Sequence, residues 1–103
     1  MQTIELVDIL PGCEPVPVLI TSTVLKHRRD DIRKFPARIV DEGEIRRFIL
    51  EPSFHELTHD NNFTVGVGCQ VNDNSGAYKC IDCYPQQGLR KVHPVLVTKK
   101  IPV

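Results

Sequence analysis

The sequence predicts a mainly β fold, a small antiparallel barrel or sandwich with one short helix; a β-rich α+β arrangement is the alternative. The leading observation is a strict period-two alternation of apolar residues over 63–71. Several other short runs are rich in Val, Ile and Thr and are bounded by prolines. With 103 residues, 41% hydrophobic and 25% charged, residues 1–103 are expected to form a single globular domain.

The first third of the chain predicts two strands followed by the helix. The runs at 3–10 and 16–23 have the β-branched composition of strands. Apolar residues then recur at helical spacing behind a serine–threonine pair that can cap a helix, which predicts the helix over 23–35. The recurring apolar residues are Leu25, Ile32 and Phe35.

The middle of the chain predicts a hairpin and a helical turn. The runs 36–40 and 45–50 flank a polar segment in which Gly43 can supply the positive φ of a tight reversal. Ser53 and Glu56 then match the S-x-x-E capping box. One or two turns of helix are therefore expected directly after this serine.

The last third predicts three further strands. The alternating run 63–71 is the clearest of all, and its valines and Cys69 are expected to face the core. The cluster of Asn, Asp, Ser and Gly at 72–76 then predicts a turn into a second strand over 77–84, which completes a hairpin. The final run, 92–101, is again of β type.

Charge and hydropathy exclude several classes of partner. Thirteen basic and thirteen acidic side chains cancel, so no global field attracts the chain to nucleic acid or to an anionic membrane. The N-terminus lacks the basic and apolar regions of a secretory signal, and no apolar run is long enough to span a bilayer. We therefore expect a soluble cytoplasmic protein whose four cysteines are reduced thiols or metal ligands.

Residues 55–59 read His-Glu-Leu-Thr-His. Over these five residues the chain resembles the zinc-binding H-E-x-x-H helix of metallopeptidases. The resemblance implies that His55 and His59 bind zinc while Glu56 activates a metal-bound water. The motif lies in the first turn of a helix that stops at 61–62, however, so we predict a connecting helix and place a minimal metallohydrolase last among the functions considered.

A second candidate metal motif is the C-x-x-C pair Cys80 and Cys83. A structural zinc site needs four ligands, and His93 is one of the further candidates. In a regular strand the two cysteines would point to opposite faces, so they could share a metal only if the backbone bends between them. No cofactor is predicted, and zinc is the alternative.

Basic residues at Arg28, Arg29, Arg33 and Lys34 form the candidate surface for nucleic acid. On a helix these spacings usually give a solvated charged face, and no aromatic residues are interleaved with them. Binding of nucleic acid is therefore an alternative that the sequence does not favour.

The predicted function is a non-enzymatic protein-binding or assembly module, most simply a homo-oligomer without a membrane partner. Several proline-punctuated strands and extended termini predict sheet edges that another chain would cover. The expected contact residues lie on the terminal strands. They are Ile4, Leu6, Val95 and Val97.

Overall fold

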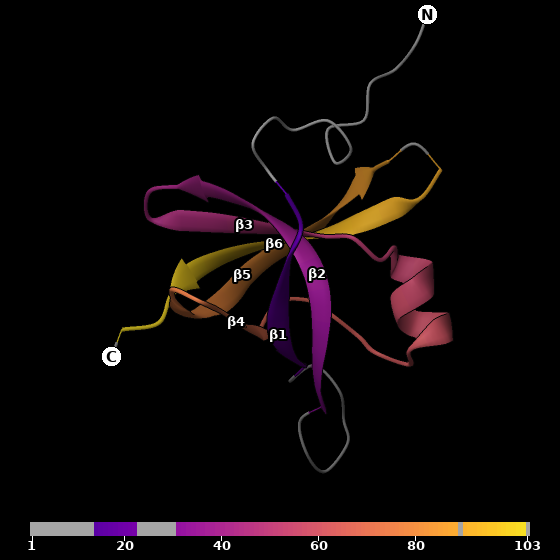
Figure 1. Ribbon diagram of the computed structural model, residues 1–103, viewed down its shortest axis with the longest axis horizontal. Helices are drawn as coiled ribbons and strands as arrows, with labels where there is room; N and C mark the ends of the chain where they lie inside the picture. The colour runs from indigo at the N-terminus through magenta and orange to yellow at the C-terminus, as the bar shows by residue number, and fades with distance from the viewer. Residues whose placement is uncertain (1–13, 23–30, 89, 103) are drawn as a thin grey trace, which may run out of the picture.

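A computed structural model describes residues 14–22, 31–88 and 90–102 of the chain (Figure 1). Six antiparallel strands form a closed barrel in the order β1-β2-β3-β6-β5-β4, which confirms the predicted mainly β fold. The strands are β1 (Val16–Ser22), β2 (Asp31–Glu42), β3 (Ile45–Leu50), β4 (Gln70–Asp73), β5 (Gly76–Gln87) and β6 (Val92–Lys100). A π-helical turn, η1 (Glu56–Asp60), connects β3 to the segment before β4.

Both predicted hairpins are present. In the first, β2 pairs with β3 up to Glu42 and Ile45, and Gly43 adopts the expected positive φ of 82° between them. In the second, β4 pairs with β5 up to Asp73 and Gly76, so that the turn falls within the predicted polar cluster. The strands expected near 16–23 and 92–101 are also confirmed, as β1 and β6. The run at 3–10 lies outside the described residues.

The alternating segment 63–71 is a strand only from Gln70 onward, so this prediction was largely wrong. The N–H of Cys69 donates to the carbonyl of Gly66 (3.2 Å) in a local turn, and Gly68 has a φ of 103°. Val67 lies in this turn with 62% of its surface exposed. Two glycines in one short segment therefore made a turn, although the apolar alternation continues through it.

The helix predicted over 23–35 was also wrong where the structure describes it. Residues from Asp31 to Phe35 belong to β2 and pair with β1, with Phe35 opposite Val18. Ile32 points outward and Phe35 inward, so strand pairing took precedence over a spacing that also fits a helix. Residues 23–30 lie outside the described part of the chain. Among the described residues, no helix is long and apolar enough to cross a membrane.

The barrel interior is filled by large apolar side chains from all six strands and from the segment before β4. The rings of Phe63 and Phe35 pack at a tilt of 55° with centroids 5.2 Å apart, and Phe48 meets Tyr78 edge-on at 5.6 Å. The fully buried core also includes Ile20, Leu50, Leu57, Val71 and Leu96.

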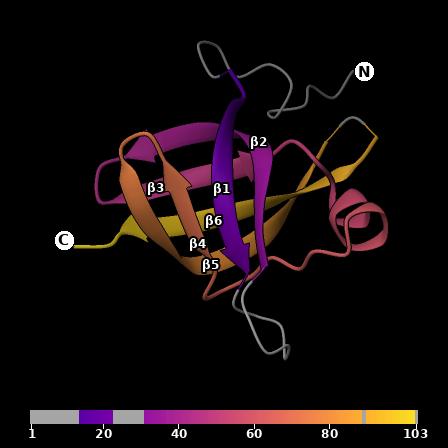
Figure 2. The ribbon, with the colours of Figure 1, turned by 60° about the horizontal axis from the view of Figure 1, so that its bottom comes forward.

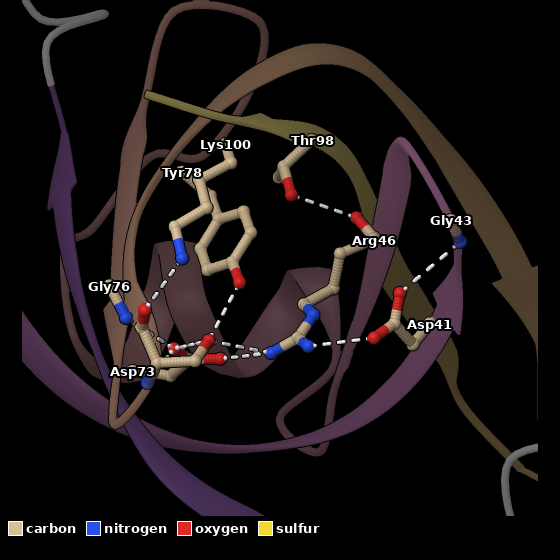
Figure 3. A network of polar contacts seen from close by, with 9 residues as sticks. Asp41, Gly43, Arg46, Asp73, Gly76, Tyr78, Thr98 and Lys100 are labelled. Carbon is tan, nitrogen blue, oxygen red and sulfur yellow. Dashed lines mark hydrogen bonds and ion pairs between the residues drawn. The ribbon is translucent and has the colours of Figure 1, made fainter. Parts of the chain in front are cut away.

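One end of the barrel is closed by a polar network around Arg46 (Figure 3). Arg46 lies in phase with inward-facing Phe48, over the ring of Tyr78 at 5.0 Å, and forms ion pairs with Asp73 (2.8 Å) and Asp41 (2.9 Å). Burial alone would raise the pKa of Asp73, but hydrogen bonds from Ser75 and Arg46 outweigh it and hold this pKa below its usual value. The network thus keeps a partly buried cation and anion charged together.

The barrel accounts for most of the sheet edges that the sequence left open. Within the described residues, the distal part of the β5–β6 hairpin extends past the barrel on the side where η1 lies (Figures 1 and 2). On this edge the Cys83 N–H points away from β6 and donates to the Asp82 carboxylate (2.9 Å). Two residues later Pro85, which lies opposite Pro94, occupies the position whose N–H would point the same way. Proline has no N–H, so this projecting edge offers few donors to another strand.

Candidate functional site

The C-x-x-C cysteines lie on the same face of β5. Cys80 is opposite Thr98 and Cys83 is opposite Leu96, two residues apart on the regular strand β6, because a bulge shifts the register after Cys80. Both thiols therefore face the barrel interior. The backbone bend that the sequence analysis required between them is present.

The environment of these thiols suits packing better than reactivity. Burial, together with the nearby Cys83, raises the pKa of Cys80 to about 12, and burial likewise raises the pKa of Cys83. Cys69 joins them as a fully buried neighbour: its carbonyl accepts the Cys80 N–H at 2.8 Å. Thiols held in the neutral form are poor metal ligands and poor nucleophiles.

His93 does not join the cysteines as a ligand. It is buried, and its Nδ1 lies 3.1 Å from the carbonyl oxygen of Leu50, a bond that fixes the ring. Within the described ranges, no three His, Cys, Asp or Glu side chains stand together as a metal site. The proposed zinc site around Cys80 and Cys83 thus has no third ligand among these residues.

The helical turn η1 is held by the capping box that the sequence predicts. The Ser53 N–H donates to Glu56 Oε1 (2.8 Å), and the Glu56 N–H donates to Ser53 Oγ (3.1 Å). Lys91, in the loop before β6, forms an ion pair with the other carboxylate oxygen of Glu56, with Nζ 2.9 Å from Oε2. These bonds, that from Lys91 foremost, lower the pKa of Glu56. Both carboxylate oxygens of the residue that would serve as the base of the motif are therefore engaged.

His55 and His59 lie on the exposed side of η1. Their rings stack with centroids 4.3 Å apart at an interplanar angle of 24°. His55 also lines a hollow of about 580 Å³ between η1 and the loop before β6, together with Glu56, Asp60, Arg90 and Lys91. The structure thus brings the two histidines together, but among the described residues they form no metal-binding group with the cysteines or with His93.

The candidate nucleic-acid residues do not form one basic surface in the described chain. Arg33 faces inward: it donates to the carbonyl of Asn61 (2.9 Å) and lies over the Phe63 ring at 5.6 Å. Lys34, its neighbour, points to the opposite side of β2 and is exposed. Arg28 and Arg29 lie outside the described residues.

The predicted contact residues of β6 are not available on the surface. Val95 is 1% exposed and Val97 is 7% exposed. Val95 packs with Ile49, Val40 and Tyr84 in a second small apolar cluster on the outer side of the barrel. Ile4 and Leu6 lie outside the described residues.

Sequence reasoning missed a different apolar surface, the outer side of β1 and β2. Here three cross-strand pairs face outward, because the intervening Val18, Ile20 and Phe35 fill the core. We name this surface the β1–β2 outer face; its residues are Pro17, Leu19, Thr21, Ile32, Lys34 and Pro36. Leu19 is 44% exposed and Ile32 is 58% exposed. The missed signal was a strand, 16–22, that is apolar in both of its alternating phases.

A hollow of about 390 Å³ borders the β1–β2 outer face at the seam between β1 and β4. Leu19 and Lys34 contribute one side of this hollow, and Asn72, Asp73 and Asn74 contribute the other. The carboxylate of Asp73 is already bonded to Arg46, which leaves the asparagine side as the neutral polar wall. The outer face thus ends in a polar rim.

Comparisons with known proteins add no family to this geometry. No family model matches the chain, and neither a curated protein nor a solved structure gives a match.

Proposed function

We propose that the domain is a non-enzymatic assembly module that associates with a second copy of itself through the β1–β2 outer face. The observation that carries the proposal is the exposure of Leu19 and Ile32, which are diagonal neighbours on the same face of two paired strands. A contiguous exposed apolar surface with a polar rim is typical of a protein contact.

The composition of this face supports a homotypic contact. Lys34 is the one charged residue among its six members, and two opposed prolines, Pro17 and Pro36, add rigid apolar area. Interfaces between identical subunits are more apolar than transient ones. Lys34 belongs to the middle pair, so a contact would require its long side chain to extend the amine to the rim. Contact through the face also needs no free strand edge, which agrees with a closed barrel.

The state of the candidate catalytic groups supports a non-enzymatic role. Glu56 is engaged by Ser53 and Lys91, and the Cys80 thiol is held neutral by burial. His93 is fixed against a backbone carbonyl. A general base or nucleophile needs a free, suitably titrating group, and these three are committed to the fold.

The test is the oligomeric state in solution, measured by size-exclusion chromatography with light scattering over a range of concentrations. We expect the natural chain to shift from monomer to dimer as its concentration rises. The double variant Leu19→Asp/Ile32→Asp is expected to remain a monomer, because two buried carboxylates would oppose the contact.

Ile81→Asp is the matched control, because Ile81 is 44% exposed, as Leu19 is, but lies on the bulge of β5. This control should dimerise like the natural chain. A natural chain that stays monomeric at the highest concentration, or a double variant that still dimerises, would overturn the proposal.

A further inference from the structure

The proposed assembly role leaves the H-E-x-x-H histidines unused, although the fold holds them in a defined position. Their spacing of four residues places them on one side of η1, and their rings lie 4.3 Å apart and nearly parallel. Imidazole binds a metal ion through a ring nitrogen, in the plane of the ring and at about 2.0–2.1 Å, so the stacked arrangement shows that the two side chains are neighbours but does not itself direct both nitrogens at one point. Both side chains are exposed, and rotation about their side-chain bonds would let one nitrogen from each ring reach a common ion.

We propose that His55 and His59 form a two-ligand surface site for a divalent transition-metal ion of the Zn²⁺ and Ni²⁺ class. Imidazole nitrogen suits these ions better than it suits Mg²⁺ or Ca²⁺, which prefer oxygen ligands. Water completes the coordination, so the ion exchanges readily and the site is not one that holds the fold together.

The backbone beneath the pair is fixed before any ion binds. Leu57, between the two histidines, is 1% exposed and anchors η1 to the core. The capping box of Ser53 and Glu56 fixes the start of the turn, and the Thr58 hydroxyl donates to the Phe54 carbonyl at 2.9 Å. The ion therefore need not order this segment, which removes part of the entropic cost of binding.

The surroundings leave the ring nitrogens available. Among the described residues, no hydrogen bond engages a ring nitrogen of His55 or His59. Asp60 lies in the same hollow as His55 and is exposed, so its negative charge favours a cation. On the other wall, the charge of Lys91 is offset by its ion pair with Glu56, and Arg90 is the opposing cation.

Glu56 takes no part in this site. Its carboxylate is shared between the Ser53 N–H and Lys91, so the motif acts as a chelating pair without the base that a metallopeptidase requires. The two histidines can therefore act as a chelating pair on a short exposed turn, while the glutamate between them serves only the fold. A two-ligand site also agrees with the finding that no three potential ligands gather among the described residues.

The experiment is isothermal titration of the untagged full chain with NiCl₂ and, separately, with ZnCl₂. We expect one ion per chain, with binding weakened about tenfold or more in His55→Ala and in His59→Ala. Paramagnetic Ni²⁺ should broaden the amide NMR signals of residues 54–60 before others. Both substitutions are at exposed positions, and unchanged circular dichroism would confirm that each variant folds.

His27→Ala is the matched control and should bind both ions as the natural chain does. Three results would overturn the proposal: no uptake of either ion at millimolar concentration, full affinity in both histidine variants, or loss of affinity in His27→Ala. The Leu19→Asp/Ile32→Asp variant should keep its metal affinity, so a failure of the assembly proposal is distinguishable from a failure of this one.

Discussion

Outward-facing apolar residues are buried on one side of the barrel and exposed on the other. On β3, β6 and β5, the outward Ile49, Val95 and Val97 are buried, and Val95 packs with Val40 and Tyr84. On β1 and β2, the outward Leu19 and Ile32 are exposed. Both regions follow the same period of two, so the difference arises from what the fold places over each strand. Apolar alternation identifies a face without telling whether the chain itself covers it.

The largest loss of stability is expected from a charge placed among the buried outward residues of β3 and β6. Val95→Asp should lower the free energy of unfolding by about 3–5 kcal/mol, because a carboxylate would lose its water without gaining a partner. Val67→Asp is the matched control and should change stability by no more than about 0.5 kcal/mol, since Val67 is 62% exposed. Urea unfolding measures both. Equal losses of stability in the two variants would show that Val95 is not buried in solution.

A smaller effect is expected from the polar network beside the β1–β2 outer face. Asp73→Asn keeps an oxygen for the turn at Ser75 but removes the ion pair with Arg46, and should cost about 2 kcal/mol at pH 7. Asp60→Asn, an exposed change of the same chemistry, should cost almost nothing. Thermal unfolding in parallel for both variants checks this.

The pH dependence of the same pair follows from the sign of the shift. The pKa of Asp73 is lower in the folded chain than its unfolded value of about 3.9, so its stabilising contribution is complete above that value. The contribution disappears as the pH falls through the folded pKa. The natural chain should therefore lose more stability than Asp73→Asn as the pH falls below about 4. The measurement is the free energy of unfolding of both chains as a function of pH. The same pH dependence in both would contradict the assigned ion pair.

The sequence predicted the mainly β class, both hairpins and the capping box of η1, because turn and cap residues act locally. It misplaced 31–35 as helix and 63–69 as strand, because pairing with β1 and the two glycines before Cys69 decided those segments. Closure of the barrel and the bulge at Cys80 depend on contacts between distant strands. No local pattern reports such contacts, so the burial of Val95 and Val97 could not be predicted from the sequence.

A further prediction concerns the cap of η1, which belongs to neither outer side. Ser53→Ala should cost about 1 kcal/mol, because the Glu56 N–H would lose its partner. Glu56→Gln should cost less, since glutamine can still accept from the Ser53 N–H while only the exposed pair with Lys91 is lost. Denaturant unfolding of both variants gives the order. The reverse order would mean that the ion pair, and not the cap, holds η1.

The smallest effect on stability is expected on the exposed side. Leu19→Asp should change the free energy of unfolding of the monomer by no more than about 0.5 kcal/mol, because its side chain is already in contact with water. The measurement is chemical unfolding at a concentration where the natural chain is monomeric. A loss near that of Val95→Asp would show that the β1–β2 outer face is covered within the chain.

The ring of strands is closed by its shortest ladder, three residue pairs between β1 and β4, beginning at Leu19 and Asn72 and ending at Thr21 and Gln70. Because fewer residue pairs must separate here than at any other seam, we expect the barrel to open between β1 and β4 first. Opening there would turn a closed cylinder into a six-stranded sheet with β1 at one margin and β4 at the other. A contact that covers the β1–β2 outer face would hold that margin in place, so assembly and barrel integrity would reinforce each other.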